Sequence, residues 1–181
     1  AAGALIGAIQ GWLIGRKGLA PFIVTLGGLL FARGFARLIT YEGQKTYAVP
    51  KGSGFLSLNG ATVPAALTVA LVCGLLLRRT PFGLRLTAVG GAEDASGLMG
   101  VPVARTKILV YLLSGTLAGL AGVLVAAQMG SGTVTMGLGL ELDAIAAVAI
   151  GGTMLWGGPG TVAGTLAGVA LLWVIRDMVD Q

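Results

Sequence analysis

Long apolar runs with few charged residues divide this chain, and they limit what it can fold into more than any other feature does. The runs lie at about 1–15, 22–40, 61–77, 108–128, 142–156 and 161–176. Each is near the roughly 17–25 residues that a membrane-spanning helix needs, although several are at or below the lower limit. Backbone groups in lipid have no water to bind, and the alternation typical of barrel strands is absent, so the runs should be helical. We therefore predict an all-α, polytopic transmembrane helix bundle of about six spans or partial spans, forming one domain over 1–181.

The composition excludes several kinds of chemistry. Hydrophobic residues make up 55% of the 181 residues and charged residues only 10%, against roughly a quarter charged in soluble domains. The sequence has no histidine and a single cysteine, Cys73, which rules out histidine-dependent catalysis, His/Cys metal sites and an internal disulfide. We expect no catalytic residue, no metal site and no cofactor in this chain. The formal charge of +5 comes from basic residues between the apolar runs, a pattern typical of membrane topology and not of nucleic-acid binding.

These basic residues predict the orientation in the membrane. One short connection carries Arg16 and Lys17. The long connection 78–107 carries five more, Arg78, Arg79, Arg85, Arg105 and Lys107. Lysine and arginine are enriched in cytoplasmic loops, so both connections should face the cytoplasm. The segment 41–60 then forms an external loop, whose two lysines, Lys45 and Lys51, are exceptions to the rule.

Two stripes of glycine at four-residue spacing predict close helix packing. The first comprises Gly3, Gly7, Gly11 and Gly15, and the second comprises Gly160, Gly164 and Gly168. Residues at this spacing share one face of a helix, where small side chains let a neighbouring helix approach. We interpret both stripes as packing surfaces and not as substrate contacts.

The polar connection 78–107 is longer than two neighbouring helices require. Its segment 92–99 is expected to form a short helix, preceded by a sharp turn that Gly90 and Gly91 permit. Carboxylates at its start complement the helix dipole, and apolar residues at its end offer an anchor. The residues concerned are Glu93, Asp94, Ala95, Leu98 and Met99. On composition alone, two interpretations stay open: a solvated loop and a docking element for a partner protein.

Four charged residues lie within or beside apolar runs, and each pair has two interpretations. Arg33 and Arg37 stand one helical turn apart and share a face, at a depth where charge needs water or a partner. They either line a translocation path or extend to the outer interface, with Glu42 as a partner. Glu141 and Asp143 stand at the start of a helix, where they either complement its dipole as a cap or form a polar gate at the outer mouth.

Glycine and proline interrupt the last apolar region between residues 151 and 160. A broken helix at membrane depth is tolerated only where its backbone is buried in protein or lines a cavity. The interruption therefore predicts a turn or a re-entrant bend. Because the flanking runs are each near the minimum spanning length, the sequence leaves both open.

In five stretches, and in this order, the sequence resembles the ribose/xylose-type permease subunits of bacterial ABC sugar importers. The stretches are 21–27, 90–101, 113–122, 141–147 and 150–161. The resemblance covers nearly the whole chain, but such permeases have additional N-terminal helices and a final C-terminal helix. Since the chain also begins without Met, we expect it to be a piece of a longer permease.

The resemblance implies an importer driven by ATP that moves a monosaccharide, with a pentose such as xylose or ribose as substrate. It implies a permease that is not itself an enzyme, multi-pass in the bacterial cytoplasmic (inner) membrane. Besides membrane lipid, its partners would be a second permease copy, a periplasmic or extracellular sugar-binding protein, and a cytoplasmic ATPase that binds ATP and magnesium. In this family the stretch resembling 90–101 holds the coupling helix, which sits in a groove of the ATPase. The alternatives are a secondary transporter using Asp143 for proton coupling, an ABC permease for branched-chain amino acids or nucleosides, and a non-transporting scaffold.

Overall fold

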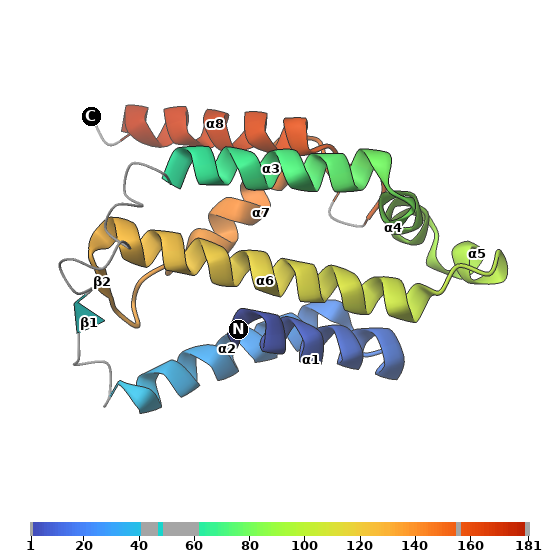
Figure 1. The fold of residues 1–181 in the computed structure, drawn as a ribbon, viewed down its shortest axis with the longest axis horizontal. Coiled ribbons are helices and arrows are strands. Elements are labelled where there is room, and N and C mark those ends of the chain that lie inside the picture. The colour runs from blue at the N-terminus through green and yellow to red at the C-terminus, as the bar shows by residue number, and fades with distance from the viewer. Residues whose placement is uncertain (1, 41–46, 49–61, 155–156, 180–181) are drawn as a thin grey trace. The chain divides into compact units, whose positions relative to one another are not determined.

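The fold is that of a computed structural model, which describes residues 2–40, 47–48, 62–154 and 157–179. The elements in chain order are α1 (Ala2–Lys17), α2 (Pro21–Ile39), β1 (Tyr47–Ala48), α3 (Thr62–Arg79), α4 (Pro81–Gly91), α5 (Glu93–Leu98), α6 (Val103–Met129), β2 (Ser131–Gly132), α7 (Leu140–Ile150) and α8 (Val162–Val179) (Figure 1). They form two compact units. Unit 1 comprises Ala1–Ala65 and Pro102–Met136, and unit 2 comprises Ala66–Val101 and Gly137–Gln181.

Four of the described helices are long and apolar enough to cross a membrane, namely α2, α3, α6 and α8. The predicted all-α, polytopic fold class is thereby confirmed. The other two apolar runs also form helices, but α1 has 16 residues and α7 has 11. Both are shorter than the roughly 20 residues of a full span.

Unit 1 is built on a close antiparallel contact between α1 and α6, which lie side by side in Figure 1 (dark blue and yellow). The first glycine stripe forms this contact. Gly3, Gly7, Gly11 and Gly15 face, in this order, Gly115, Tyr111, Ile108 and Ala104 of α6. A Cβ atom added at Gly11 would lie 2.9 Å from the Ile108 Cα. The two backbones therefore approach each other only because the stripe carries no side chains.

The rest of unit 1 consists of α2 and a two-residue strand pair. A proline at the first helical position, Pro21, begins α2, as its fixed φ and missing N–H favour. The strands are antiparallel, with Tyr47 opposite Gly132 and Ala48 opposite Ser131. Apart from these two residues, the predicted external loop 41–60 lies outside the described residues, and so do its charged side chains, Glu42, Lys45 and Lys51.

In unit 2, α7 packs antiparallel against α8 through the second glycine stripe. A Cβ atom added at Gly168 would meet the Ala147 carbonyl oxygen, and one at Gly164 would meet that of Gly151. Gly160 differs from the expectation, because α8 begins at Val162 and leaves Gly160 outside the helix. A Cβ atom there would lie 2.8 Å from the Thr153 Oγ1, so Gly160 packs within the turn.

The described residues of the interruption, 151–154 and 157–160, are not helical, and the chain reverses between α7 and α8. Its glycines Gly152, Gly157 and Gly158 have φ values of +84°, +98° and +126°, which side chains disfavour. The turn rests on the end of α4, since a Cβ atom at Gly157 would meet the Gly90 carbonyl oxygen. One at Gly90 would lie 3.3 Å from the backbone nitrogen of Gly158.

The connection 78–107 is more helical than expected. Residues 81–91 form α4, which the sequence interpretation missed, and α6 begins at Val103 instead of near 108. Pro81 occupies the first turn of α4 directly after Thr80, a common helix start. Only Ala92 separates α4 from α5, and four residues separate α5 from α6.

Candidate functional site

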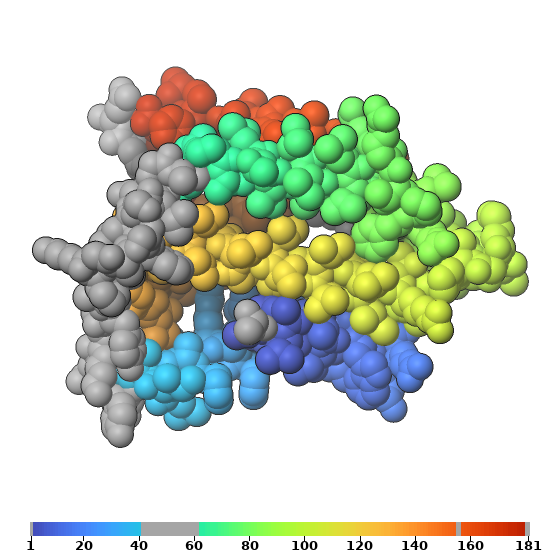
Figure 2. All heavy atoms as spheres, in the orientation of Figure 1, coloured from blue at the N-terminus to red at the C-terminus, as the bar shows by residue number. Residues whose placement is uncertain are grey.

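The short helix α5 carries the predicted docking residues and is joined to α4 by a single residue. Ala92 is extended, with φ −156° and ψ 94°, and caps the end of α4 and the start of α5. Glu93 and Asp94 occupy the first turn of α5. At its other end Leu98 is 91% exposed and Met99 is 80% exposed. In Figure 2 the yellow-green atoms of α5 stand clear of those of α3 and α4.

Backbone hydrogen bonds fix the end of α5, where isolated helices of this length are unstable. The Met99 N–H donates to the Ala95 carbonyl oxygen at 3.1 Å, and the Val101 N–H donates to that of Ser96 at 3.1 Å. Ser96 is buried, and Ala95 is half-buried. The inner face of α5 is therefore held, while its apolar end extends away from the described part of unit 2.

The sharp turn before α5 lies at Ala92 and not at the glycine pair to which we assigned it. Gly90 and Gly91 are the last residues of α4, and neither has a positive φ. The structure instead uses Gly90 for close approach to the turn at Gly157 and Gly158. The missing side chain at Gly90 thus serves this close approach and not a bend.

An ion pair joins the open ends of α7 and α8. Nη1 of Arg176 donates to Oδ2 of Asp143 at 2.6 Å. Asp143 stands in the first turn of α7, where no side chain makes a capping hydrogen bond, so its carboxylate bonds to α8 and not to the helix end. Sequence reasoning missed Arg176. In the sequence Arg176 stands out only as a basic residue near the end of an apolar run, and its partner Asp143 is 33 residues away.

A cavity of about 690 Å³ lies beside this ion pair, between α7 and α8. Its walls are mostly apolar and include Trp173, while Asp143 and Arg176 provide its charged edge. An apolar pocket with a few convergent polar groups is the usual form of a small-molecule site.

The ion pair should contribute little to stability. Because the Arg176 and Asp143 side chains are 68% and 47% exposed, solvent screens them, and we expect a coupling energy of about 0–1 kcal/mol. The measurement is a double-mutant cycle of Asp143→Asn and Arg176→Gln, read by thermal unfolding of the purified permease. The charge-exchanged variant Asp143→Arg/Arg176→Asp serves as the control and should recover the coupling. A coupling energy above about 2 kcal/mol would mean that the pair is desolvated in the assembled protein.

The remaining predicted polar residues are Glu141, Arg33 and Arg37. Glu141 is half-buried two residues before Asp143 in α7. Arg33 and Arg37 belong to unit 1, on α2, where Arg33 is half-buried and Arg37 exposed. Among the described residues, no group of three or more His, Cys, Asp or Glu side chains is placed to hold a metal ion.

Apolar helices of spanning length, glycine-lined helix contacts and an exposed helix between two spans define a polytopic α-helical membrane protein. The family described as "Branched-chain amino acid transport system / permease component" matches residues 1–181, and the chain belongs to this family. No solved structure matches the chain.

Curated relatives match nearly the whole chain. The inner membrane ABC transporter permease protein YjfF of Escherichia coli is 37% identical over 98% of this chain and 56% of its own length. The fructose import permease protein FruG of Bifidobacterium longum is 38% identical over 98% of this chain and 55% of its own length. The ribose import permease protein RbsC of Bacillus subtilis is 38% identical over 93% of this chain and 54% of its own length. The chain thus spans little more than half the length of these relatives.

These matches confirm the predicted resemblance to permeases of ABC sugar importers. They also confirm, together with the four apolar helices, a multi-pass protein of the inner membrane.

Proposed function

We propose that the chain is part of the membrane-spanning permease subunit of an ABC importer, and that the importer moves a monosaccharide across the cytoplasmic membrane. A pentose such as ribose or xylose is the proposed substrate. The observation that carries this proposal is the set of relatives, since proteins named for ribose import and fructose import are 38% identical to nearly the whole chain.

The proposed partners are a second permease copy, a sugar-binding protein on the outer side and a cytoplasmic ATPase. In this proposal ATP and magnesium bind to the ATPase, and the permease performs no hydrolysis itself. The exposed apolar end of α5 supports docking to the ATPase, because Leu98 and Met99 are uncovered within the described residues. Apolar anchors of this kind are typical of protein interfaces.

The polar residues receive roles within the same proposal. Glu93, Asp94 and Ala95 position α5 against the ATPase, while Leu98 and Met99 anchor it. Asp143, with Glu141 beside it, belongs to a polar gate at the outer mouth. The cavity beside the ion pair of Asp143 with Arg176 supports this assignment. Arg33 and Arg37 border the path or the outer interface.

Uptake into proteoliposomes tests the proposal. The complete permease, its ATPase and its sugar-binding protein are reconstituted with ATP enclosed, and labelled ribose, xylose, fructose and leucine are offered in turn. We expect pentose uptake that requires ATP and both partners, at least tenfold above uptake without ATP. Leucine is included because the family's description names branched-chain amino acids.

Three results would change the assignment. Uptake driven by an ion gradient without the ATPase would show a secondary transporter. ATP-dependent uptake of leucine and not of sugars would show an amino-acid permease. The absence of a stable ATPase partner, with no uptake of any solute, would favour a scaffold.

A further inference from the structure

Charge is divided unequally between the two units. Unit 1 carries eight of the chain's 12 lysines and arginines but a single acidic residue, Glu42, which lies outside the described residues. The eight are Arg16, Lys17, Arg33, Arg37, Lys45, Lys51, Arg105 and Lys107. Neither α1 nor α6 contains an acidic residue. Arg16, Lys17 and Arg105 therefore have no carboxylate on their own helix pair.

Four of these residues gather at one end of the α1–α6 pair. Arg16 and Lys17 end α1, whereas Arg105 and Lys107 lie in the first turns of α6. A Cβ atom added at Gly15 would lie 2.8 Å from the Ala104 carbonyl oxygen. Because Arg16 and Arg105 directly follow these two touching residues, the two arginine-bearing turns are neighbours.

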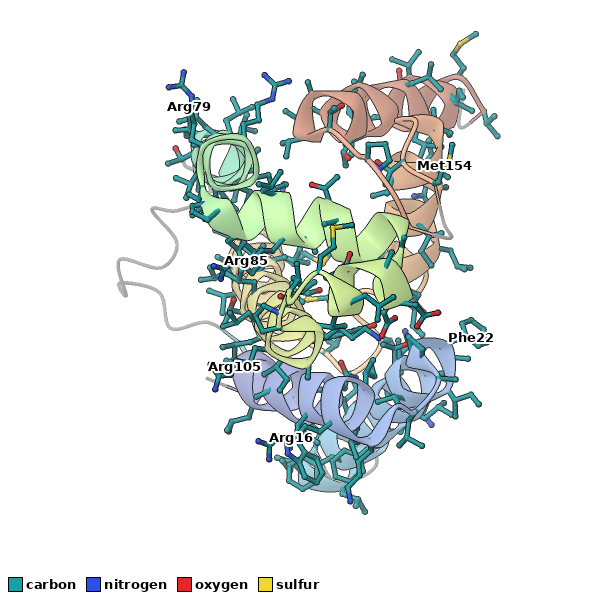
Figure 3. The ribbon with its side chains drawn as sticks, turned by 90° about the vertical axis from the view of Figure 1, so that its right-hand side faces the viewer. Arg16, Phe22, Arg79, Arg85, Arg105 and Met154 are labelled. Carbon is teal, nitrogen blue, oxygen red and sulfur yellow. The ribbon has the colours of Figure 1, made fainter. Side chains whose placement is uncertain are left out.

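Figure 3 looks onto this end, and both labelled side chains, Arg16 and Arg105, extend outward from unit 1. Both arginines are exposed, and so is Lys17. We call Arg16, Lys17 and Arg105 the basic cluster. Guanidinium groups bind phosphate oxygens through paired hydrogen bonds. The cluster thus presents two exposed guanidinium groups and one exposed ammonium group on adjoining turns of α1 and α6.

Neighbouring side chains place the basic cluster at a membrane surface. Nζ of Lys17 lies 5.7 Å from the centre of the Trp12 ring, and tryptophan with basic residues is typical of the membrane–water interface. The Trp12 side chain is itself 44% exposed, so the ring and the Lys17 ammonium group reach the surface of unit 1 together.

We propose that the basic cluster binds the phosphate group of an anionic phospholipid in the cytoplasmic leaflet. Basic pockets between transmembrane helices on this side of a membrane are known to hold anionic headgroups. The positive-inside rule explains why these residues face the cytoplasm. It does not explain why two arginines from different helices stand side by side without an acidic residue on either helix. The site is independent of the sugar and of the proposed import function.

Native mass spectrometry of the complete, purified permease tests this site. The protein is released from micelles containing phosphatidylglycerol and phosphatidylcholine, and the retained lipids are counted. We expect Arg16→Gln/Arg105→Gln to retain at least fivefold less phosphatidylglycerol than the wild type. The matched control is Arg33→Gln/Arg37→Gln, which removes the same charge from α2 of the same unit and should retain wild-type levels. Arg16→Lys/Arg105→Lys keeps the charge and should retain more phosphatidylglycerol than the glutamine variant.

The alternative occupant of the basic cluster is an acidic surface of the ATPase. If Arg16→Gln/Arg105→Gln retains wild-type amounts of phosphatidylglycerol but no longer co-purifies with the ATPase, the basic cluster binds the ATPase. That result would overturn the lipid site. If the control variant loses as much phosphatidylglycerol, the loss depends only on the net charge of the protein. That result would also overturn the lipid site. If the glutamine variant does not fold, the lysine variant decides. If the folded lysine variant retains less than half of the wild-type phosphatidylglycerol, guanidinium groups recognise the phosphate. If it retains the full amount and does not prefer phosphatidylglycerol over phosphatidylcholine, the proposal is contradicted.

Discussion

Replacing Leu98 and Met99 with aspartate is expected to separate the permease from its ATPase. Both side chains are uncovered within the described residues, at 91% and 80% exposure, so the change leaves the fold of α5 and every spanning helix intact. Two central apolar anchors contribute about 2 kcal/mol each to a protein interface, and the loss of both, about 4 kcal/mol, weakens association by roughly a thousandfold. The measurements are ATPase co-purification and ATP-dependent sugar uptake, and both should fall to background together.

The control for this variant keeps the apolar surface and changes only its shape. Exchanging the two residues, as Leu98→Met/Met99→Leu, conserves volume and hydrophobicity and should preserve at least half of the uptake. Normal co-purification and uptake by the double aspartate variant, at wild-type abundance, would remove α5 from the interface with the ATPase.

Gly164→Leu is expected to disrupt the packing of α7 on α8. The glycine lies against the backbone of Gly151, and an added Cβ atom would also lie 2.9 Å from the Thr161 Oγ1. Backbone cannot move aside as a flexible side chain does. We therefore expect the free energy of unfolding to fall by about 3 kcal/mol, the upper end of the range for overpacked cores. Abundance in the membrane should fall several-fold, and the midpoint of thermal unfolding of the purified protein should drop.

Ala167→Leu is the matched control for Gly164→Leu, because it adds a similar volume to the same helix at an exposed position. It should retain wild-type abundance. If both variants are equally scarce, α8 is enclosed on all sides in the assembled protein. If both are normal, the contact between Gly164 and Gly151 does not hold the two helices together.

The sequence predicts the helices well where membrane physics dominates. The runs 22–40 and 61–77 become α2 and α3 with ends shifted by at most two residues, because an apolar stretch of spanning length in lipid has to form a helix. The first glycine stripe can also be recognised in the sequence. Four glycines at helical spacing define a groove, and α6 lies in it.

Features that depend on contacts between residues far apart in the chain could not be predicted from the sequence. Helix α4 was missed because its glycine-rich end, Gly90–Gly91, suggests a turn, whereas Gly90 packs against the chain some 67 positions later, at Gly157 and Gly158. The pairing of Asp143 with Arg176 has the same origin, since it follows from the antiparallel packing of α7 on α8 and not from any local pattern. Propensities and spacing report on neighbours along the chain, and tertiary contacts decide the rest.

The backbone contact between Gly90 and Gly157 has a mechanical consequence. Where two backbones touch, no flexible side chains lie between them to absorb a displacement. Close-packed protein transmits strain. Helix α4 and the turn after α7 therefore meet at Gly90 and Gly157 through backbone atoms alone. Because a single residue, Ala92, joins α4 to α5, the chain path from the exposed helix to this backbone contact is short. The ion pair lies at the opposite ends of α7 and α8.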